Sequence, residues 1–233
     1  MKDKKNIVIA LLAILTLIKI PQAEIRFVFW VLSGIIFCAG IDFLINNIYW
    51  KKRIFPKSAI ITGFIISGIL DYHQPFYMLA VIAALAILSK HIIKYKEKHI
   101  FNPANFALFT ASVFKLPLTW SIESNIYLII LVGLYLAYSI KKIPHVVGFL
   151  VFFSVFSLID RINPFIFISW FFLFIMLIEP KTSGFGMKRG FVFGGITGIT
   201  AFLIYKLVPV IDIFTGSLFV ANLANPVLQK IRG

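Results

Sequence analysis

The chain has 233 residues, of which 60% are hydrophobic, 16% are aromatic and only 14% are charged. A soluble domain is about 45–50% apolar and about 25% charged, so this composition excludes an ordinary soluble enzyme and indicates an all-α polytopic membrane protein. The formal net charge of +14 does not indicate nucleic-acid binding, because the basic residues lie in short stretches between apolar runs, where the positive-inside rule places them.

Ten apolar segments alternate with stretches rich in charge, proline or glycine. A helix needs about 20 residues to cross about 30 Å of hydrocarbon, and several segments are shorter. Short segments are expected where a broken helix lines an enclosed cavity, but a locally thin bilayer or misplaced boundaries explain them equally well. The candidate spans are Ile7–Ile20, Phe27–Ile48, Ser58–Leu70, Phe76–Ile93, Phe101–Phe114, Ile126–Ile140, Val146–Ile159, Pro164–Ile178, Phe191–Leu207 and Val210–Leu228.

The charges between these segments predict the topology. We interpret the first segment as an uncleaved helix, because its lysine-rich start is not followed by a small-residue cleavage site. With ten spans and the N-terminus inside, 18 of the 23 basic residues fall on the inner side and five on the outer side. The asymmetry is regular at every loop, so we expect a multi-pass protein of the cell membrane with both termini cytoplasmic.

Ten spans divide into two sets of five, at approximately residues 1–120 and 121–233. A repeat with an odd number of spans must invert in the membrane. Asn102-Pro103-Ala104-Asn105 breaks the fifth span, and the Asn222–Pro226 stretch breaks the tenth. We therefore expect one membrane domain, residues 1–233, built from two inverted five-helix repeats, with the functional site where the broken helices meet.

Asn102 and Asn105 present amide donors and acceptors at the first of these breaks. Proline at the second position removes one backbone donor and disfavours helix before it. The two side chains could therefore hold a polar ligand. Equally, they could cap the broken helix and bond to backbone groups of the opposite repeat.

Two carboxylates are candidates for an ion or proton pathway. Asp42 lies inside an apolar run, where an ionisable group is costly; the alternative is that it lies near the cytoplasmic end and pairs with Lys51 or Lys52. Glu179 lies beside Pro180 at a predicted helix break. No metal site is expected, because the chain has one cysteine and four histidines without ligand spacing.

Three stretches taken in order are similar to a known family: Ser58–Phe64, Ala86–His91 leading into Phe101–Ala104, and Ile178–Ser183. They resemble the NqrB/RnfD family of membrane proteins, which is shared by the sodium-translocating NADH:quinone reductase and the Rnf electron-transport complex. Each motif is short, but their order and spacing together are fairly specific. The chain differs from the family in having Glu179 where aspartate is usual and Gly184 where proline is common.

The resemblance implies a membrane subunit that couples electron transfer to ion movement and works with other membrane subunits in the lipid bilayer. It also implies a non-covalent flavin, riboflavin or FMN, near Thr62 and Asn102, with Asn105 beside them. Covalent FMN is not expected, since the 115–124 loop lacks the family's threonine attachment motif. Two alternatives remain open: a stand-alone solute channel or transporter on the same scaffold, and a purely structural subunit.

Overall fold

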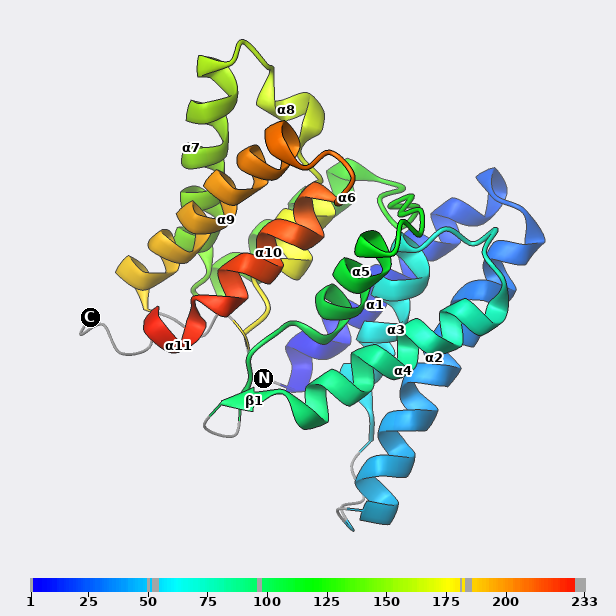
Figure 1. The fold of residues 1–233 in the computed structure, drawn as a ribbon. Coiled ribbons are helices and arrows are strands. Elements are labelled where there is room, and N and C mark those ends of the chain that lie inside the picture. The colour runs from blue at the N-terminus through cyan, green and yellow to red at the C-terminus, as the bar shows by residue number, and fades with distance from the viewer. Residues whose placement is uncertain are drawn as a thin grey trace.

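The computed structural model describes residues 2–49, 51, 55–95, 98–180, 182 and 186–228, and they are mostly helical (Figure 1). The α-helices are α1 (Lys2–Lys19), α2 (Ile25–Leu44), α3 (Lys57–Ile69), α4 (Phe76–Ile92), α5 (Pro103–Val113), α6 (Ile126–Ser139), α7 (Ile143–Ile159), α8 (Pro164–Phe167), α9 (Met187–Leu207), α10 (Ile213–Leu223) and α11 (Asn225–Leu228). The remaining elements are the 3₁₀ turn η1 (Ile20–Gln22), the π-helical turns η2 (Ile45–Tyr49) and η3 (Phe172–Met176), and the two-residue strands β1 (Lys94–Tyr95) and β2 (Lys98–His99), which pair antiparallel.

Every one of the ten predicted apolar segments forms helix, which confirms the predicted all-α class. Three helical stretches of the described chain are long and apolar enough to cross a membrane: Lys4–Gln22, Ile25–Ile48 and Met187–Leu207. Five further apolar helices, α3, α4, α6, α7 and α10, are shorter. The fifth segment yields only the 11 residues of α5.

The eighth segment is broken into α8 and η3, and side chains satisfy the backbone at the break. The N–H of Trp170 donates to Oε1 of Glu123 at 2.7 Å, and the N–H of Phe172 donates to Oγ of Ser169 at 3.0 Å. Burial raises the pKa of the Glu123 carboxyl, against hydrogen bonds that lower it. A loop residue from outside the segment thus stabilises an interruption that would leave backbone donors unpaired.

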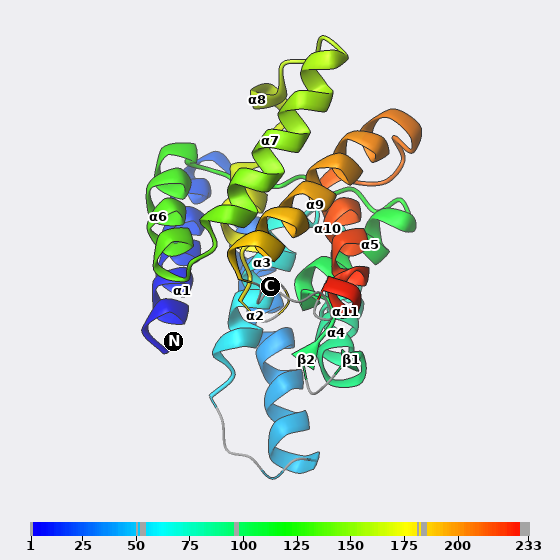
Figure 2. The ribbon, with the colours of Figure 1, turned by 90° about the vertical axis from the view of Figure 1, so that its left-hand side faces the viewer.

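The helices form two groups that follow chain order (Figures 1 and 2). In the first group, α2 packs against α3 and α4; in the second, α7 packs along α9. The groups meet where α10 lies against α5 and where α1 lies beside α6. Segments that are far apart in the sequence are therefore brought to one interface from opposite halves.

Glycines allow the closest helix contacts. A Cβ on Gly63 would lie 2.6 Å from the carbonyl oxygen of Gly34, so α3 and α2 touch backbone to backbone. A Cβ on Gly198 would lie 2.7 Å from the carbonyl oxygen of Phe149, which brings α9 equally close to α7. Small residues at such contacts are typical of helix packing in membranes.

Candidate functional site

A cavity of about 130 Å³ lies between the two groups of helices. Lys5 of α1 and Thr62 of α3 line it from the first half, together with Asn102 just before α5. Phe174 of η3 and Glu179 line it from the second half. Most of the wall is apolar, with these polar side chains on it, as in small-molecule sites generally.

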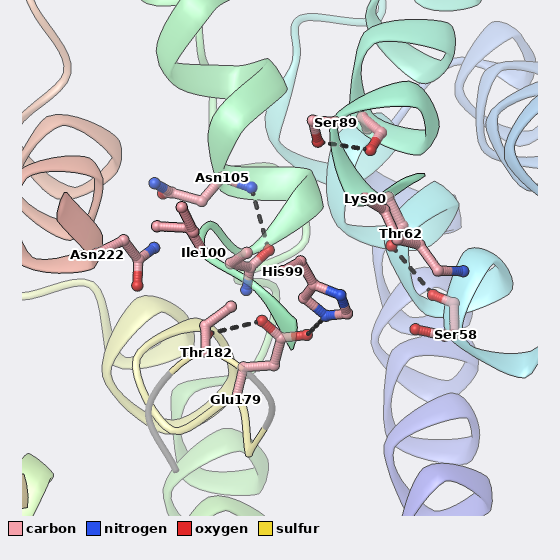
Figure 3. Close-up of polar contacts among 12 residues, drawn as sticks. Ser58, Thr62, Ser89, Lys90, His99, Ile100, Asn105, Glu179, Thr182 and Asn222 are labelled. Atoms are coloured by element: carbon pink, nitrogen blue, oxygen red, sulfur yellow. Dashed lines mark hydrogen bonds and ion pairs between the residues drawn. The ribbon is translucent and has the colours of Figure 1, made fainter. Parts of the chain in front are cut away.

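All three stretches that carry the family resemblance contribute side chains to this one cavity. Ser58 and Thr62 belong to the first stretch, Asn102 to the second and Glu179 to the third. These residues are separated by up to 121 positions in the sequence (58 to 179), so the fold alone brings them together. Figure 3 shows Ser58 and Thr62 on one side and Glu179 on the other.

The hydroxyl of Thr62 is already bonded within its own helix. Its Oγ1 donates to the carbonyl oxygen of Ser58 at 3.0 Å, and the residue is 5% exposed. The hydrogen of that hydroxyl is therefore engaged, and the oxygen is left as an acceptor. Thr62 can receive a hydrogen bond from a ligand but has no donor to offer.

Asn102 is both a helix cap and a cavity residue. Its Oδ1 accepts from the N–H of Asn105 at 3.1 Å, and Pro103 starts α5, where the missing N–H costs nothing. The residue is 4% exposed. Within the described chain its Nδ2 donates no hydrogen bond, so a residue that lines the cavity keeps a donor for a ligand.

Replacing Asn102 with Ala is expected to lower the free energy of unfolding by about 1 kcal/mol, because the cap of α5 is lost. Asn102→Asp keeps an acceptor for the Asn105 N–H and is expected to unfold near the wild-type midpoint. Thermal unfolding of each purified variant in detergent, monitored by circular dichroism, measures the unfolding midpoint and the change in stability. Equal destabilisation by the two substitutions would contradict a capping role.

The structure places Asn105 away from the cavity. The residue is fully buried, and its Nδ2 donates to the carbonyl oxygen of Thr215 in α10 at 3.0 Å. Its Oδ1 has no hydrogen-bond partner in the described structure. Of the three residues predicted to surround one ligand, Thr62 and Asn102 lie at the cavity and Asn105 joins the two halves instead.

The two asparagine–proline breaks are neighbours at the α5–α10 interface. Nδ2 of Asn225 donates to the carbonyl oxygen of Ile100 at 3.0 Å, and at the opposite end the N–H of Asp212 donates to Oγ of Ser112 at 2.6 Å. The two 11-residue helices are therefore antiparallel. Between them the Phe219 ring stacks on Phe109, with 4.1 Å between ring centroids.

Glu179 is held at the cavity by one polar contact from its own stretch and one from the segment before α5 (Figure 3). Its Oε2 accepts from the hydroxyl of Thr182 at 2.9 Å, and its Oε1 lies 4.0 Å from Nε2 of His99. Lys142 is buried nearby, and its Nζ lies 3.2 Å from Nε2 of His145. Burial lowers the pKa of Lys142 to about 8, while Glu179 acts in the opposite direction.

The sequence did not single out Lys142 and His145, because both lie in a basic stretch that reads as a solvated cytoplasmic loop. Their burial comes from tertiary packing: Gly190 of α9 leaves room for the His145 ring, which is fully buried. The available signal was a lysine three positions before a histidine, with Pro144 between them at the start of a helix.

Stability is expected to rise with pH between about 8 and 10.5, the buried and ordinary pKa values of Lys142. In this window the folded protein has lost the Lys142 proton while the unfolded chain still binds it, so raising the pH favours folding. Thermal midpoints measured across this range should rise in the wild type. Lys142→Met should flatten the rise, and an unchanged pH profile in that variant would contradict the burial of the ammonium group.

Asp42 lies in a separate buried ion cluster between α2 and α4. Its Oδ1 is 2.7 Å from Nζ of Lys90 and 2.9 Å from Nε2 of His91, and the residue is 2% exposed. Asp42 does pair with a cation, but the partner is Lys90 with His91, whereas Lys51 makes no such contact and Lys52 lies outside the described residues. Asp42 does not line the cavity at Glu179.

In the described part of the chain, no group of three or more His, Cys, Asp and Glu residues is placed to hold a metal ion. Cys38, one turn before Asp42, is fully buried in α2. Gly184 and most of the stretch around it lie outside the described residues.

The cavity meets only part of the requirements of a flavin. The donor on Asn102 and the acceptor on Thr62 suit the carbonyl and N–H edge of the flavin ring. A cavity of about 150 Å³ holds a benzene molecule, and this one measures about 130 Å³. The donor chemistry therefore suits one edge of the ring, and the volume is that of a body with about one ring. A bound flavin stays a prediction, and no electron-transfer step is assigned to the cavity.

No protein-family model matches the sequence, and a search of curated proteins finds no match.

Proposed function

We propose that this chain is a multi-pass membrane subunit of an ion-translocating electron-transport complex of the Rnf and sodium-translocating NADH:quinone reductase kind. The observation that carries the proposal is the meeting of Ser58 and Thr62, Asn102, and Glu179 at one cavity. The resemblance of the stretches they belong to lies in their sequence alone and does not depend on where they lie in space. Their meeting at one cavity between the halves is what a shared ligand site would require.

The proposed architecture has ten spans in two inverted repeats, with both termini cytoplasmic. Two observations support it: the basic residues fall mainly on one side, and α5 and α10 are antiparallel helices of equal length at the interface of the halves. Each begins with a side-chain cap, from Asn102 and from Asp212. Broken helices that face each other across such an interface are typical of inverted-repeat transport proteins.

The ion-coupling step is proposed for Glu179, with Asp42 as a second position on the pathway. Glu179 borders the cavity and faces His99, with the buried Lys142 close enough to influence its charge. A carboxylate in such surroundings can take up or release a proton or a small cation as the charge nearby changes. A non-covalent flavin near Thr62 and Asn102 stays a prediction of the resemblance, and further redox centres are proposed to lie on partner subunits.

The deciding experiment is isolation of the tagged chain from its own membranes in mild detergent, followed by native electrophoresis and absorbance spectroscopy. The proposal expects the chain to migrate in a larger complex whose spectrum contains flavin or iron–sulfur absorbance. A chain that migrates alone, in fractions without redox absorbance, would overturn it. Titration of the isolated chain with riboflavin, followed by fluorescence, tests separately whether the cavity opens enough for a flavin.

The size of the cavity favours a second candidate, a stand-alone solute transporter. A volume of about 130 Å³ suits a small solute, and its place between the halves is where alternating-access proteins bind their substrates. Uptake of a labelled solute into liposomes containing only this chain would favour the transporter. Uptake that depends on a redox partner would favour the electron-transport complex.

A further inference from the structure

We propose that the cavity between the halves binds a small organic anion: an acidic group on an apolar body about the size of one ring. The inference rests on the proposed ligand site and names the ligand class, which neither the resemblance nor the proposed function supplies. It is independent of whether the chain belongs to an electron-transport complex.

The charge of the lining favours an anion. Lys4 and Lys5, on successive positions of α1, both border the cavity, and Glu179 is the carboxylate on its wall. The Glu179 carboxylate already accepts from Thr182 and faces His99. Nζ of Lys4 donates to the carbonyl oxygen of Ser139 beside the cavity. By formal charge, the lining therefore carries two ammonium groups against one carboxylate.

The N-terminus of α5 contributes a hydrogen-bond donor and the helix dipole to the cavity. Asn102 is 4% exposed, lines the cavity and carries an Nδ2 with no hydrogen-bond partner in the described chain. It stands at the N-terminus of an 11-residue helix, where the aligned peptide dipoles favour a negative charge. Half-helix N-termini directed at the acidic group of a substrate are a recurring arrangement in membrane transport proteins.

The remaining wall sets the size and polarity of the body that carries the acidic group. Apolar side chains line it from both halves, with Val8 and Ile65 on one side and Phe174 and Ile175 on the other. The volume of about 130 Å³ is slightly below that of a cavity known to hold benzene. A one-ring or short branched body fits these walls, whereas an inorganic anion would leave them uncovered.

Benzoate and benzamide provide matched probes, because they share shape and differ in charge. The full chain, purified in detergent, is titrated with each, and thermal unfolding reports binding. We expect benzoate to raise the midpoint and to bind at least about tenfold more tightly than benzamide, since charge-assisted hydrogen bonds are roughly twice as strong as neutral ones. Equal binding of the two, or no shift with either, overturns the proposal.

Two variants locate the anion. Asn102→Asp keeps the cap of α5 but replaces the cavity donor with a carboxylate, and Lys5→Gln removes a positive charge from the wall; both should abolish the benzoate shift. Lys188→Gln removes an exposed lysine outside the cavity and should leave the shift intact. A benzoate shift that survives both cavity substitutions places the anion elsewhere and overturns the proposal.

A further pair of probes identifies the acidic group. Phenyl phosphate carries the same ring with a phosphate, and inorganic phosphate carries no ring. Tighter binding of benzoate assigns a carboxylate, and tighter binding of phenyl phosphate assigns a phosphate, while inorganic phosphate alone as the best ligand would overturn the apolar body. If none of the ring anions binds, the anion proposal is overturned. Native electrophoresis still tests the proposed complex independently, so the two proposals can be told apart.

Discussion

Replacing Asp42 with Ala is expected to lower the free energy of unfolding by about 3–5 kcal/mol. The substitution removes the carboxylate that lies 2.7 Å from the ammonium of Lys90 and 2.9 Å from the ring of His91. Lys90 is only 13% exposed at its side chain, so its charge would be left buried without compensation. Unfolding of the purified protein in mixed micelles of increasing SDS fraction measures the change.

The matched control removes both charges. Asp42→Leu combined with Lys90→Met replaces the buried pair by apolar side chains of similar volume, and such replacements are often neutral or stabilising. We expect the double variant to regain most of the stability that Asp42→Ala loses. A double variant that is as unstable as the single one would show that Asp42 stabilises the fold through something other than its cation.

The same double variant separates stability from ion movement. Because it is folded and carries no charge at position 42, any loss of coupled ion flux in the isolated complex can be assigned to the missing carboxylate. Flux at the wild-type rate would remove Asp42 from the proposed pathway and leave Glu179 as the candidate. The comparison works only because the compensating partner, Lys90, is known from the structure.

Local sequence was sufficient to predict where the helices lie. Apolar runs bounded by charge or proline mark every helical segment, and Asn102 with Pro103 marks the start of α5, since a capping side chain and a missing N–H act within one turn. The break inside the eighth segment was not predicted. It depends on Glu123, 47 positions away, which supplies the acceptor for the Trp170 N–H.

The sequence did not indicate which residues far apart in the chain would pair. The alternative to a pathway role for Asp42 was pairing with Lys51 or Lys52, which follow it in the chain, but its partners lie 48 and 49 positions further on, at the end of α4. Asn105 was grouped with Asn102 because the two are close in sequence. Asn102 caps α5, whereas Asn105 lies inside the helix, where its Nδ2 donates to the carbonyl oxygen of Thr215 in α10.

Replacing Gly198 with Leu is expected to separate α9 from α7 and to destabilise the protein by roughly 3 kcal/mol, at the upper end of overpacking costs. A Cβ at this position would lie 2.7 Å from the carbonyl oxygen of Phe149 and 3.0 Å from the N of Phe153. Both neighbours are helix backbone, which cannot rotate away as a side chain would, so the helices themselves must move apart.

Gly40→Leu provides the matched control, since a Cβ there meets nothing within 4 Å and the residue lies exposed in α2. The same substitution should be neutral or gain up to about 1 kcal/mol there, because leucine favours helix over glycine. Unfolding midpoints of the two variants, measured side by side, therefore separate the effect of packing from that of helix propensity.

Since α10 packs on α9 as well as on α5, Gly198→Leu should also weaken the contact between the two asparagine–proline breaks. Equal midpoints for the two leucine variants would contradict close backbone packing between α7 and α9. The position of α10 would then not depend on that contact.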